Sequence, residues 1–369
     1  MKHSVNIVVF PGDGIGIEVM EPCLEILNAV AAKLGTVSLK FDTHQAGAIQ
    51  YREHGVALPD TALAAARRAD AILLGAMGWP EVRYPDGTEI APQIDLRMEL
   101  DLYAGVRPVR TLPNVPNVLA DPRARNLDFV IIRESTEGLF ASRGIKQINS
   151  HEEARDTLVI TRKVSEKLFD FSFGLARQRA KASGREGTVT CVDKANVFTS
   201  FAFFRKIFDE RAALNRDIKA EHAYVDAMSL FMVRKPWELD VLVTENMFGD
   251  ILSDLGAGLL GGLGFAPSAD IGDRHAVFQP CHGTAPDIAG QGKANPIAMI
   301  LSAAMMLEWL GEKQDRSDLA LGGRLIRSAV NDAFEKGLRP LEIGGPDGTR
   351  ATANAVLEAL KHAHDAVPA

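Results

Sequence analysis

Short apolar runs alternate with longer segments of helical periodicity along most of the chain. Runs rich in β-branched and apolar residues predict strands at residues 6–10, 37–43, 71–74, 129–133, 188–192 and 241–244. Segments in which apolar residues recur every three or four positions predict helices at residues 17–33, 60–69, 165–183, 298–310 and 319–336. This alternation is typical of an α/β fold in which helices cover both faces of a sheet.

Two segments interrupt this pattern and predict crossings between domains. The first contains four prolines, at positions 108, 113, 116 and 122, and the second is the glycine-rich run at residues 256–264. A chain that leaves one domain and later returns to it needs two such crossings. We therefore expect one domain to comprise residues 1–108 plus 265–369, and a second domain to comprise residues 109–264.

Composition narrows the class of protein. The net charge of −7 makes nucleic acid an unlikely partner, because an acidic surface repels phosphate backbones. No apolar stretch is long enough to span a bilayer, so no membrane partner is expected. The cysteines at positions 23, 191 and 281 are few and widely spaced, which indicates a reducing compartment. The sequence therefore predicts a cytoplasmic protein.

A glycine turn follows the first predicted strand. Residues 11–16 carry glycine at positions 12, 14 and 16 and open a helix, which suits either a dinucleotide fingerprint or a phosphate-binding loop. The spacing matches neither motif. A tight turn that needs unusual backbone dihedral angles explains these glycines at least as well as contact with a ligand does.

Three arginines are candidates for carboxylate binding. Arg133 ends a strongly apolar run, and the end of a buried strand is where α/β proteins place binding groups. Its guanidinium group can donate two parallel hydrogen bonds to a carboxylate. Arg97 and Arg107 both precede Pro108, the first proline of the proline-rich segment. For these two, surface ion pairing is as good an explanation as substrate binding.

Two aspartates predict a metal site. Asp250 and Asp254 are four residues apart, so their carboxylates lie side by side if the segment is a helix. A hard divalent cation offsets the repulsion between them, and paired carboxylates suit Mg²⁺ or Mn²⁺. A third acid, Asp226, could complete the set, although sequence position alone does not bring it there. The alternative is an acidic stripe that faces solvent.

A histidine-containing loop is a further candidate for ligand binding. Residues 280–290 are rich in glycine and proline, and they include His282. Asn295 follows, just before a predicted helix. Such a loop can wrap a ligand with backbone groups while these two side chains contribute hydrogen bonds. A structural loop with one exposed histidine explains the pattern equally well.

Together, these motifs resemble those of the β-decarboxylating dehydrogenases, which comprise the isopropylmalate, isocitrate, homoisocitrate and tartrate/D-malate dehydrogenases. The resemblance extends from the glycine turn at 11–16 to the glycines at 344 and 345, and the 250–254 segment and the 282–287 loop are its most specific parts. It implies an α/β isopropylmalate dehydrogenase-like fold that is not a Rossmann fold. Two domains with mixed sheets flanked by helices, a cleft between the domains, and a homodimer with shared active sites are expected.

The resemblance also implies roles for individual residues. Arg97, Arg107 and Arg133 would bind the substrate carboxylates, and Lys194 would reach in from the partner subunit as general base or proton relay. Asp226, also from the partner, would join Asp250 and Asp254 around Mg²⁺ or Mn²⁺. The residues expected to bind the cofactor are His282, Gly283, Ala285, Asp287, Ile288 and Asn295. NAD is the expected cofactor, because a carboxylate at position 287 accepts hydrogen bonds from the ribose hydroxyls of NAD and repels the 2′-phosphate of NADP.

Three features depart from the family pattern. Phe140 stands where the family has a tyrosine that protonates the product enolate, and Gln279 stands where it has a glutamate. Residues 89–94 match neither the isopropylmalate nor the isocitrate pattern.

The predicted activity is the oxidative decarboxylation of a malate-type 2-hydroxy acid such as 3-isopropylmalate, with tartrate or D-malate as further possibilities. The alternative is a non-catalytic or regulatory subunit of an isocitrate dehydrogenase-like assembly.

Overall fold

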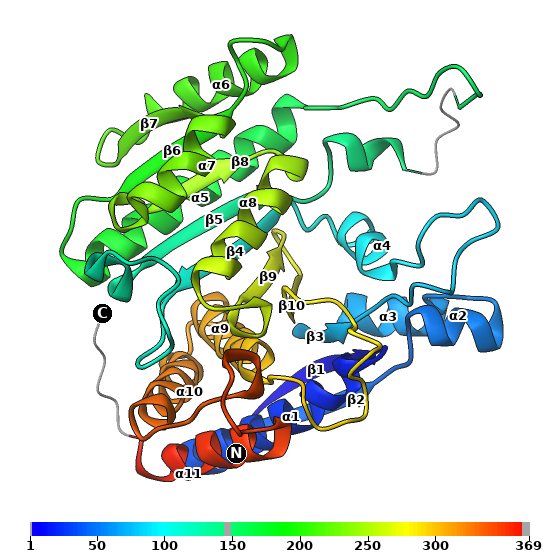
Figure 1. Ribbon diagram of the computed structural model, residues 1–369, viewed down its shortest axis with the longest axis vertical. Coiled ribbons are helices and arrows are strands. Elements are labelled where there is room, and N and C mark those ends of the chain that lie inside the picture. Colours follow the sequence, from blue (N-terminus) through cyan, green and yellow to red (C-terminus); the bar gives the residue numbers. More distant parts are fainter. Residues whose placement is uncertain (1, 144–148, 364–369) are drawn as a thin grey trace.

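The fold is an α/β architecture built on one ten-stranded sheet (Figure 1). The computed structural model describes residues 2–143 and 149–363. The strands are β1 (His3–Gly12), β2 (Val37–Thr43), β3 (Ala71–Ala76), β4 (Ala104–Arg110), β5 (Asp128–Glu134), β6 (Thr188–Asp193), β7 (Lys219–Tyr224), β8 (Val241–Thr244), β9 (Pro267–Ile271) and β10 (Ala276–Pro280). The α-helices are α1 (Ile15–Leu34), α2 (Ala48–His54), α3 (Asp60–Arg68), α4 (Pro92–Glu99), α5 (Arg162–Ser183), α6 (Thr199–Ala212), α7 (Val225–Arg234), α8 (Asn246–Leu259), α9 (Ile297–Lys313), α10 (Ser317–Glu335) and α11 (Thr349–His362).

The sheet is mixed and continuous, with the strand order β2-β1-β3-β10-β9-β4-β5-β8-β6-β7. Its two wings are parallel, whereas β9 runs antiparallel to both β10 and β4, and β4 runs antiparallel to β5. The expected α/β class is confirmed. The pairing of β9 with β4 joins the strands of the two chain halves into one sheet, instead of leaving two separate sheets.

The parts of the chain occupy different regions of the fold. The first and last parts of the sequence, blue and orange to red, lie together in the lower part of the view, and the green middle part lies above them (Figure 1). Residue 108, the expected domain boundary, falls within β4. Because β4 pairs with a strand on each side, it is shared between the two halves.

Helices cover both faces of the sheet. α8 lies over the face that carries Arg133, since a Cβ on Gly249 would come 2.6 Å from the Cβ of Arg133. α5 and α9 pack against other parts of the sheet. Phenylalanines of α5 and α6 form an aromatic cluster between those two helices, with tilted, edge-to-face and stacked ring pairs. Within residues 2–143 and 149–363, no helix has the length and apolar character needed to cross a bilayer.

The glycine turn after β1 is explained by packing. Gly12 and Gly14 have positive φ angles of 77° and 55°. A Cβ on Gly12 would lie 1.8 Å from the carbonyl oxygen of Ala76, so a larger residue does not fit. Asp13 between them is buried, and its carboxylate accepts hydrogen bonds of 2.7–3.0 Å from three backbone N–H groups, those of Ala48, Ile49 and Gly78. The turn therefore organises the start of α2 and the end of β3.

Candidate active site

The three predicted arginines meet around one buried carboxylate. Successive residues of a strand alternate between faces, and Arg133 on β5 lies opposite Gly105 on β4, so Arg107 and Arg133 project from the same face of the sheet. Arg97 reaches this place from α4. Its Nε donates to Asp270 Oδ2 at 2.9 Å, and Arg107 Nη2 donates to Asp270 Oδ1 at 2.8 Å. All three arginines are buried, which excludes surface ion pairing as their role.

Asp270 was not predicted from the sequence, yet it is the centre of this cluster. Burial opposes its ionisation, but the guanidinium groups of Arg107 and Arg97 outweigh burial and hold the pKa of Asp270 below its usual range. Gln279, one of the departures from the family pattern, donates from Nε2 to Asp270 Oδ2 at 2.8 Å. The amide at 279 is therefore the neutral partner of a carboxylate on the neighbouring strand.

Arg133 connects the arginine cluster to α8. Its Nε donates to Asn246 Oδ1 at 2.9 Å, and its Nη1 forms an ion pair with Asp250. Burial and the nearby Arg97 charge lower the pKa of Arg133 to about 10, so positive charge is incompletely balanced at this point. Asn246 was also missed, although its position four residues before Asp250 on a helix could have identified it.

The two predicted metal ligands lie on α8 beside Arg133. Burial raises the pKa of Asp254, and the adjacent Asp250 carboxylate raises it further. The two carboxylates therefore repel each other across one helical turn, an arrangement that a divalent cation stabilises. These two residues fit a metal site that lacks at least one ligand.

Asp226 does not complete that site within one chain. It lies in the first turn of α7, where its Oδ1 is 2.8 Å from Lys194 Nζ, and this contact lowers the pKa of Asp226. In the part of the chain that the structure describes, no three His, Cys, Asp or Glu residues are grouped closely enough to hold a metal ion. Lys194 and Asp226 thus form a pair separate from Asp250 and Asp254.

An apolar surface lies on the two helices that carry these aspartates. α7 packs against α8. Leu230 and Val233 of α7 and Ile251 of α8 are 56%, 45% and 63% exposed. Large aliphatic side chains exposed on adjacent helices are typical of a surface that another protein chain covers.

The predicted cofactor loop is held in place by a single carboxylate from α1. Glu18 accepts hydrogen bonds from the backbone N–H of Gly290 at 2.9 Å and from that of Ala294 at 3.2 Å. The loop also touches the glycine turn, because Ile15 N donates to Thr284 O at 2.9 Å. The turn and the loop are therefore adjacent, although Ile15 and Thr284 are 269 positions apart in the sequence.

Side chains of this loop leave one polar group without a partner. His282 Nε2 is buried and has no hydrogen-bond partner among the described residues, and burial lowers the pKa of His282. Asp287 is exposed and Ile288 is half-buried beside it. Asn295 is buried, and its Nδ2 donates to Glu342 Oε2 at 2.9 Å, so its amide has a structural role. His282 Nδ1 lies 2.9 Å from Gly283 O, so only Nε2 lacks a partner, and this nitrogen fits a heteroaromatic ligand such as adenine.

Phe140 lies directly beside the arginine cluster. It belongs to a short 3₁₀ helix, η2 (Leu139–Ser142), and the centre of its ring is 5.3 Å from Arg133 Cζ. The nearby serine hydroxyls already donate to backbone carbonyls, that of Ser135 to Arg133 O at 3.2 Å and that of Ser142 to Leu139 O at 2.7 Å. The departure from the family pattern is thus located at the site itself.

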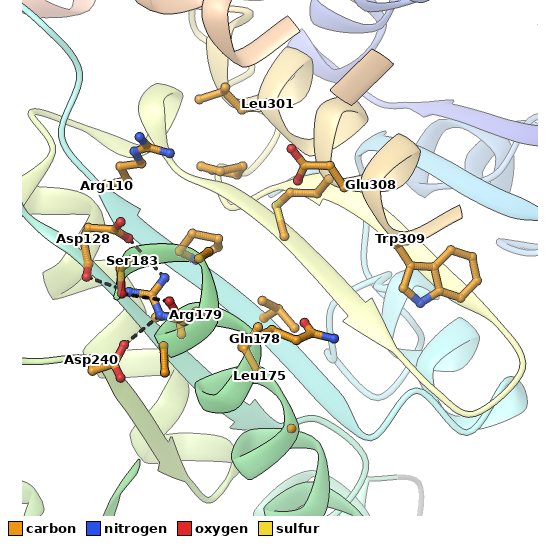
Figure 2. A pocket seen from close by; sticks show the side chains of 18 of the residues that line it. Arg110, Asp128, Leu175, Gln178, Arg179, Ser183, Asp240, Leu301, Glu308 and Trp309 are labelled. Carbon is orange, nitrogen blue, oxygen red and sulfur yellow. Dashed lines mark hydrogen bonds and ion pairs between the residues drawn. The ribbon is translucent and has the colours of Figure 1, made fainter. Parts of the chain in front are cut away.

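A cavity of about 940 Å³ lies on the opposite face of the sheet (Figure 2). Its walls include Val106 and Val130, which alternate along β4 and β5 with Arg107 and Arg133 and so face the other way. On its α5 side, Arg179 pairs with Asp128 at 3.1 Å and with Asp240 at 2.7 Å. None of the predicted site residues lines this cavity.

Comparison with known proteins places the chain in a family. Residues 6–360 match the family described as Isocitrate/isopropylmalate dehydrogenase. The chain is 41% identical over 357 residues to a 3-isopropylmalate/3-methylmalate dehydrogenase of Methanocaldococcus jannaschii, covering 96% of this chain and 99% of that protein. It is 39% identical over 363 residues to a 3-isopropylmalate dehydrogenase of Moorella thermoacetica, covering 96% and 97% of the two chains.

Solved structures agree with these relatives. The crystal structure of an isocitrate dehydrogenase from Methylococcus capsulatus matches with a TM-score of 0.84 at 36% identity, covering 97% of this chain and 99% of that one. A β-decarboxylating dehydrogenase from Thermococcus kodakarensis matches with a TM-score of 0.78 at 35% identity, covering 97% and 96%. The resemblance inferred from the motifs is confirmed, and the chain belongs to the isocitrate/isopropylmalate dehydrogenase family.

Proposed function

We propose that this protein is an NAD-dependent and divalent-metal-dependent dehydrogenase that oxidises and decarboxylates a malate-type 2-hydroxy acid of the 3-isopropylmalate class. Tartrate and D-malate share the same reacting groups. The observation that carries this proposal is the contact between Arg133 and Asp250, because it joins a buried arginine cluster to a pair of helix carboxylates. An anionic substrate and a cation that polarises its hydroxyl group need these two features side by side.

The residues of the chain divide the chemistry between them. Arg97, Arg107 and Arg133 bind and orient the substrate carboxylates, and their burial excludes competing water. Asp250 and Asp254 would hold Mg²⁺ or Mn²⁺, which when bound polarises the substrate oxygen and accepts charge as CO₂ leaves. The loop residues His282, Gly283, Ala285, Asp287, Ile288 and Asn295 would hold the adenosine end of NAD.

A homodimer completes the site in this proposal. The apolar side chains of α7 and α8 would form the contact between subunits, so that the partner's Lys194 and the partner's Asp226 enter the site beside Asp250 and Asp254. Lys194 would take the proton from the substrate hydroxyl as general base. We place the cleft between a domain of residues 1–108 plus 265–369 and a domain of residues 109–264.

The direct test is a substrate panel. The purified protein is incubated with 3-isopropylmalate, D-malate, tartrate and isocitrate, with NAD⁺ and Mg²⁺ or Mn²⁺, and NADH is measured by absorbance. At least one malate-type acid should give NADH. If none does, and activity appears only after a related subunit is added, the protein is a regulatory subunit and the proposed function is wrong.

The carboxylate of Asp287 should set the cofactor preference. NAD⁺ should be preferred over NADP⁺ by more than about tenfold in kcat/KM, because a like charge beside the 2′-phosphate is unfavourable. Asp287→Lys with Ile288→Tyr should narrow this gap. Glu53→Lys makes the same charge change at an exposed site on α2 and should leave the preference unchanged. Equal efficiency with both cofactors in the natural protein would contradict the assignment.

Phe140→Tyr should raise turnover of a decarboxylated substrate by about tenfold or more, because one acid–base group typically contributes about a hundredfold to ten-thousandfold. A phenyl ring donates no proton to the enolate that forms when CO₂ leaves, so in the natural protein the β-keto acid should leak from the site before it is decarboxylated, and NADH should form faster than CO₂. Both products are measured in one assay. Phe203→Tyr is the matched control, because its ring also lies over an arginine, with Arg162 Cζ 5.8 Å from the ring centre.

The rival explanation for Phe140 is that Ser135, Ser142 or a bound water already donates the proton. It predicts equal rates of NADH and CO₂ formation in the natural protein and no gain in Phe140→Tyr. The two serine hydroxyls donate to backbone carbonyls, which favours the first explanation.

A further inference from the structure

Asp270 occupies a place in the sheet that is prepared for a carboxylate. It lies on β9 opposite Gly105 of β4, and its side chain is 1% exposed. A Cβ on Gly105 would come 2.6 Å from Ser135 Oγ and 3.2 Å from Asp270 Oδ1. The absence of a side chain at 105 therefore leaves the space into which the Asp270 carboxylate points.

Asp270 accepts hydrogen bonds from only some of the nitrogen atoms of Arg97 and Arg107, so other nitrogen atoms can still donate to a ligand. Arg107 Nη1 donates to the carbonyl oxygens of Val106 and Ala269 at 3.2 and 2.8 Å, and its Nη2 donates to Asp270. Arg97 uses only its Nε, so its two terminal nitrogens have no hydrogen-bond partner among the described residues. A planar, bidentate donor pair thus remains available to a ligand.

Charge balance then limits the ligand. The cluster holds three guanidinium groups and one Asp270 carboxylate, which leaves two positive charges for the substrate. Asp250 also pairs with Arg133, but the two negative charges of Asp250 and Asp254 together would be balanced by the proposed divalent cation, so they do not change this count. Buried charges are stable only when they are paired, so a ligand with two carboxylates balances the cluster, and a third carboxylate finds no unpaired cation.

We propose that Asp270 is the positioning residue that makes this site selective for dicarboxylates over tricarboxylates, because it holds Arg97 and Arg107 in place and neutralises one of the three guanidinium charges. This inference rests on the proposed function for the site's role in binding a malate-type acid. Gln279 supports the arrangement from β10, because its neutral amide donates to Asp270 without adding a second charge.

The test compares two non-reacting ligands that share a carbon skeleton. Glutarate carries two carboxylates, and propane-1,2,3-tricarboxylate carries one more on the central carbon. Their dissociation constants are measured by calorimetry on the full-length protein, without turnover. In Asp270→Asn, the affinity for the tricarboxylate relative to glutarate should rise by about tenfold or more, because the neutralising charge is gone.

An exchange of acid and amide separates charge from packing. The double variant Asp270→Asn, Gln279→Glu exchanges the acid and the amide, so that residue 279 carries the carboxylate and residue 270 the amide of the same hydrogen bond. The ratio of the tricarboxylate affinity to the glutarate affinity should then return toward that of the natural protein. Asp240→Asn is the matched control. It removes the charge of another arginine-paired aspartate, at Arg179 on the opposite face of the sheet, and should leave the ratio unchanged.

The outcomes distinguish the two proposals. If neither ligand binds the natural protein and no malate-type acid gives NADH, the proposed function is wrong, whereas NADH formation without binding of either ligand overturns this inference alone. If both bind and their affinities fall equally in Asp270→Asn, Asp270 only supports packing and this inference is overturned. Should Asp270→Asn fail to fold, Gln279→Glu is measured at pH 8. An added carboxylate should lower the relative affinity for the tricarboxylate, and an unchanged ratio in the folded variant overturns the inference equally.

Discussion

Asp254→Asn should reduce turnover by about a thousandfold, the scale of several kcal/mol of transition-state stabilisation that a bound cation provides. Asp254 is the better choice for this test, because Asp250 also pairs with Arg133 and its loss would disturb substrate binding. Chelation of the natural protein should abolish activity to a similar extent, and added Mn²⁺ should restore it. Activity is followed as NADH formation while Mn²⁺ binding is measured separately by calorimetry.

The pKa of Asp254 gives the same experiment a pH dependence. Burial and the neighbouring Asp250 raise this pKa, so a cation must displace a proton as the pH falls toward it. Metal affinity in the natural protein should therefore weaken on acidification at a higher pH than it would if Asp254 had an ordinary pKa. Asp217→Asn, which removes an exposed aspartate paired with Arg177, should change neither activity nor Mn²⁺ affinity. Full activity in Asp254→Asn, or in the chelated protein, would rule out the metal assignment.

Most of the strands that the sequence predicted correctly have apolar runs that report burial directly, whereas β2 alternates apolar and polar residues at the edge of the sheet and is mostly half-buried or exposed. Residues 129–133 lie within β5, and residues 37–43 and 241–244 coincide with β2 and β8. The position of Arg133 followed from such a run, because a charged residue that ends a buried strand has few alternatives to a binding role.

β4 and β9 were missed for a physical reason. β4 contains two arginines and a proline, and β9 contains a serine and an aspartate, so neither shows an apolar run. Both are strands only because they pair with each other and with neighbours far away in sequence. Such pairing is tertiary and overrides local propensity.

Asp270 could not be predicted from the sequence either, because its role also depends on contacts between distant parts of the chain. In the sequence it is one acid among 48 Asp and Glu residues. What makes it special is its contact with Arg107 and Arg97, which lie 163 and 173 positions away. The chemistry of a buried ion cluster depends on which side chains the fold brings together, and no local pattern encodes this.

Mixing two inactive variants should restore activity if the active site is shared between subunits. Lys194→Met removes the proposed base and should lower turnover by about a hundredfold to ten-thousandfold. Asp254→Asn removes a metal ligand. In a heterodimer of the two, one site receives Lys194 from one subunit and Asp254 from the other, and it is intact, whereas the second site lacks both. Equal mixing after dissociation should therefore recover about a quarter of natural activity.

The structure provides the reason to expect this recovery. Lys194 pairs with Asp226 at 2.8 Å, apart from Asp250 and Asp254, while exposed apolar residues lie on the helices that carry the three aspartates. A mixture of Asp254→Asn with Asp250→Asn is the control, because every site of that heterodimer lacks one of two ligands on the same helix, and it should stay inactive. If heterodimers of the first pair form, as native mass spectrometry can verify, and remain inactive, Lys194 acts within its own chain and the shared site is wrong.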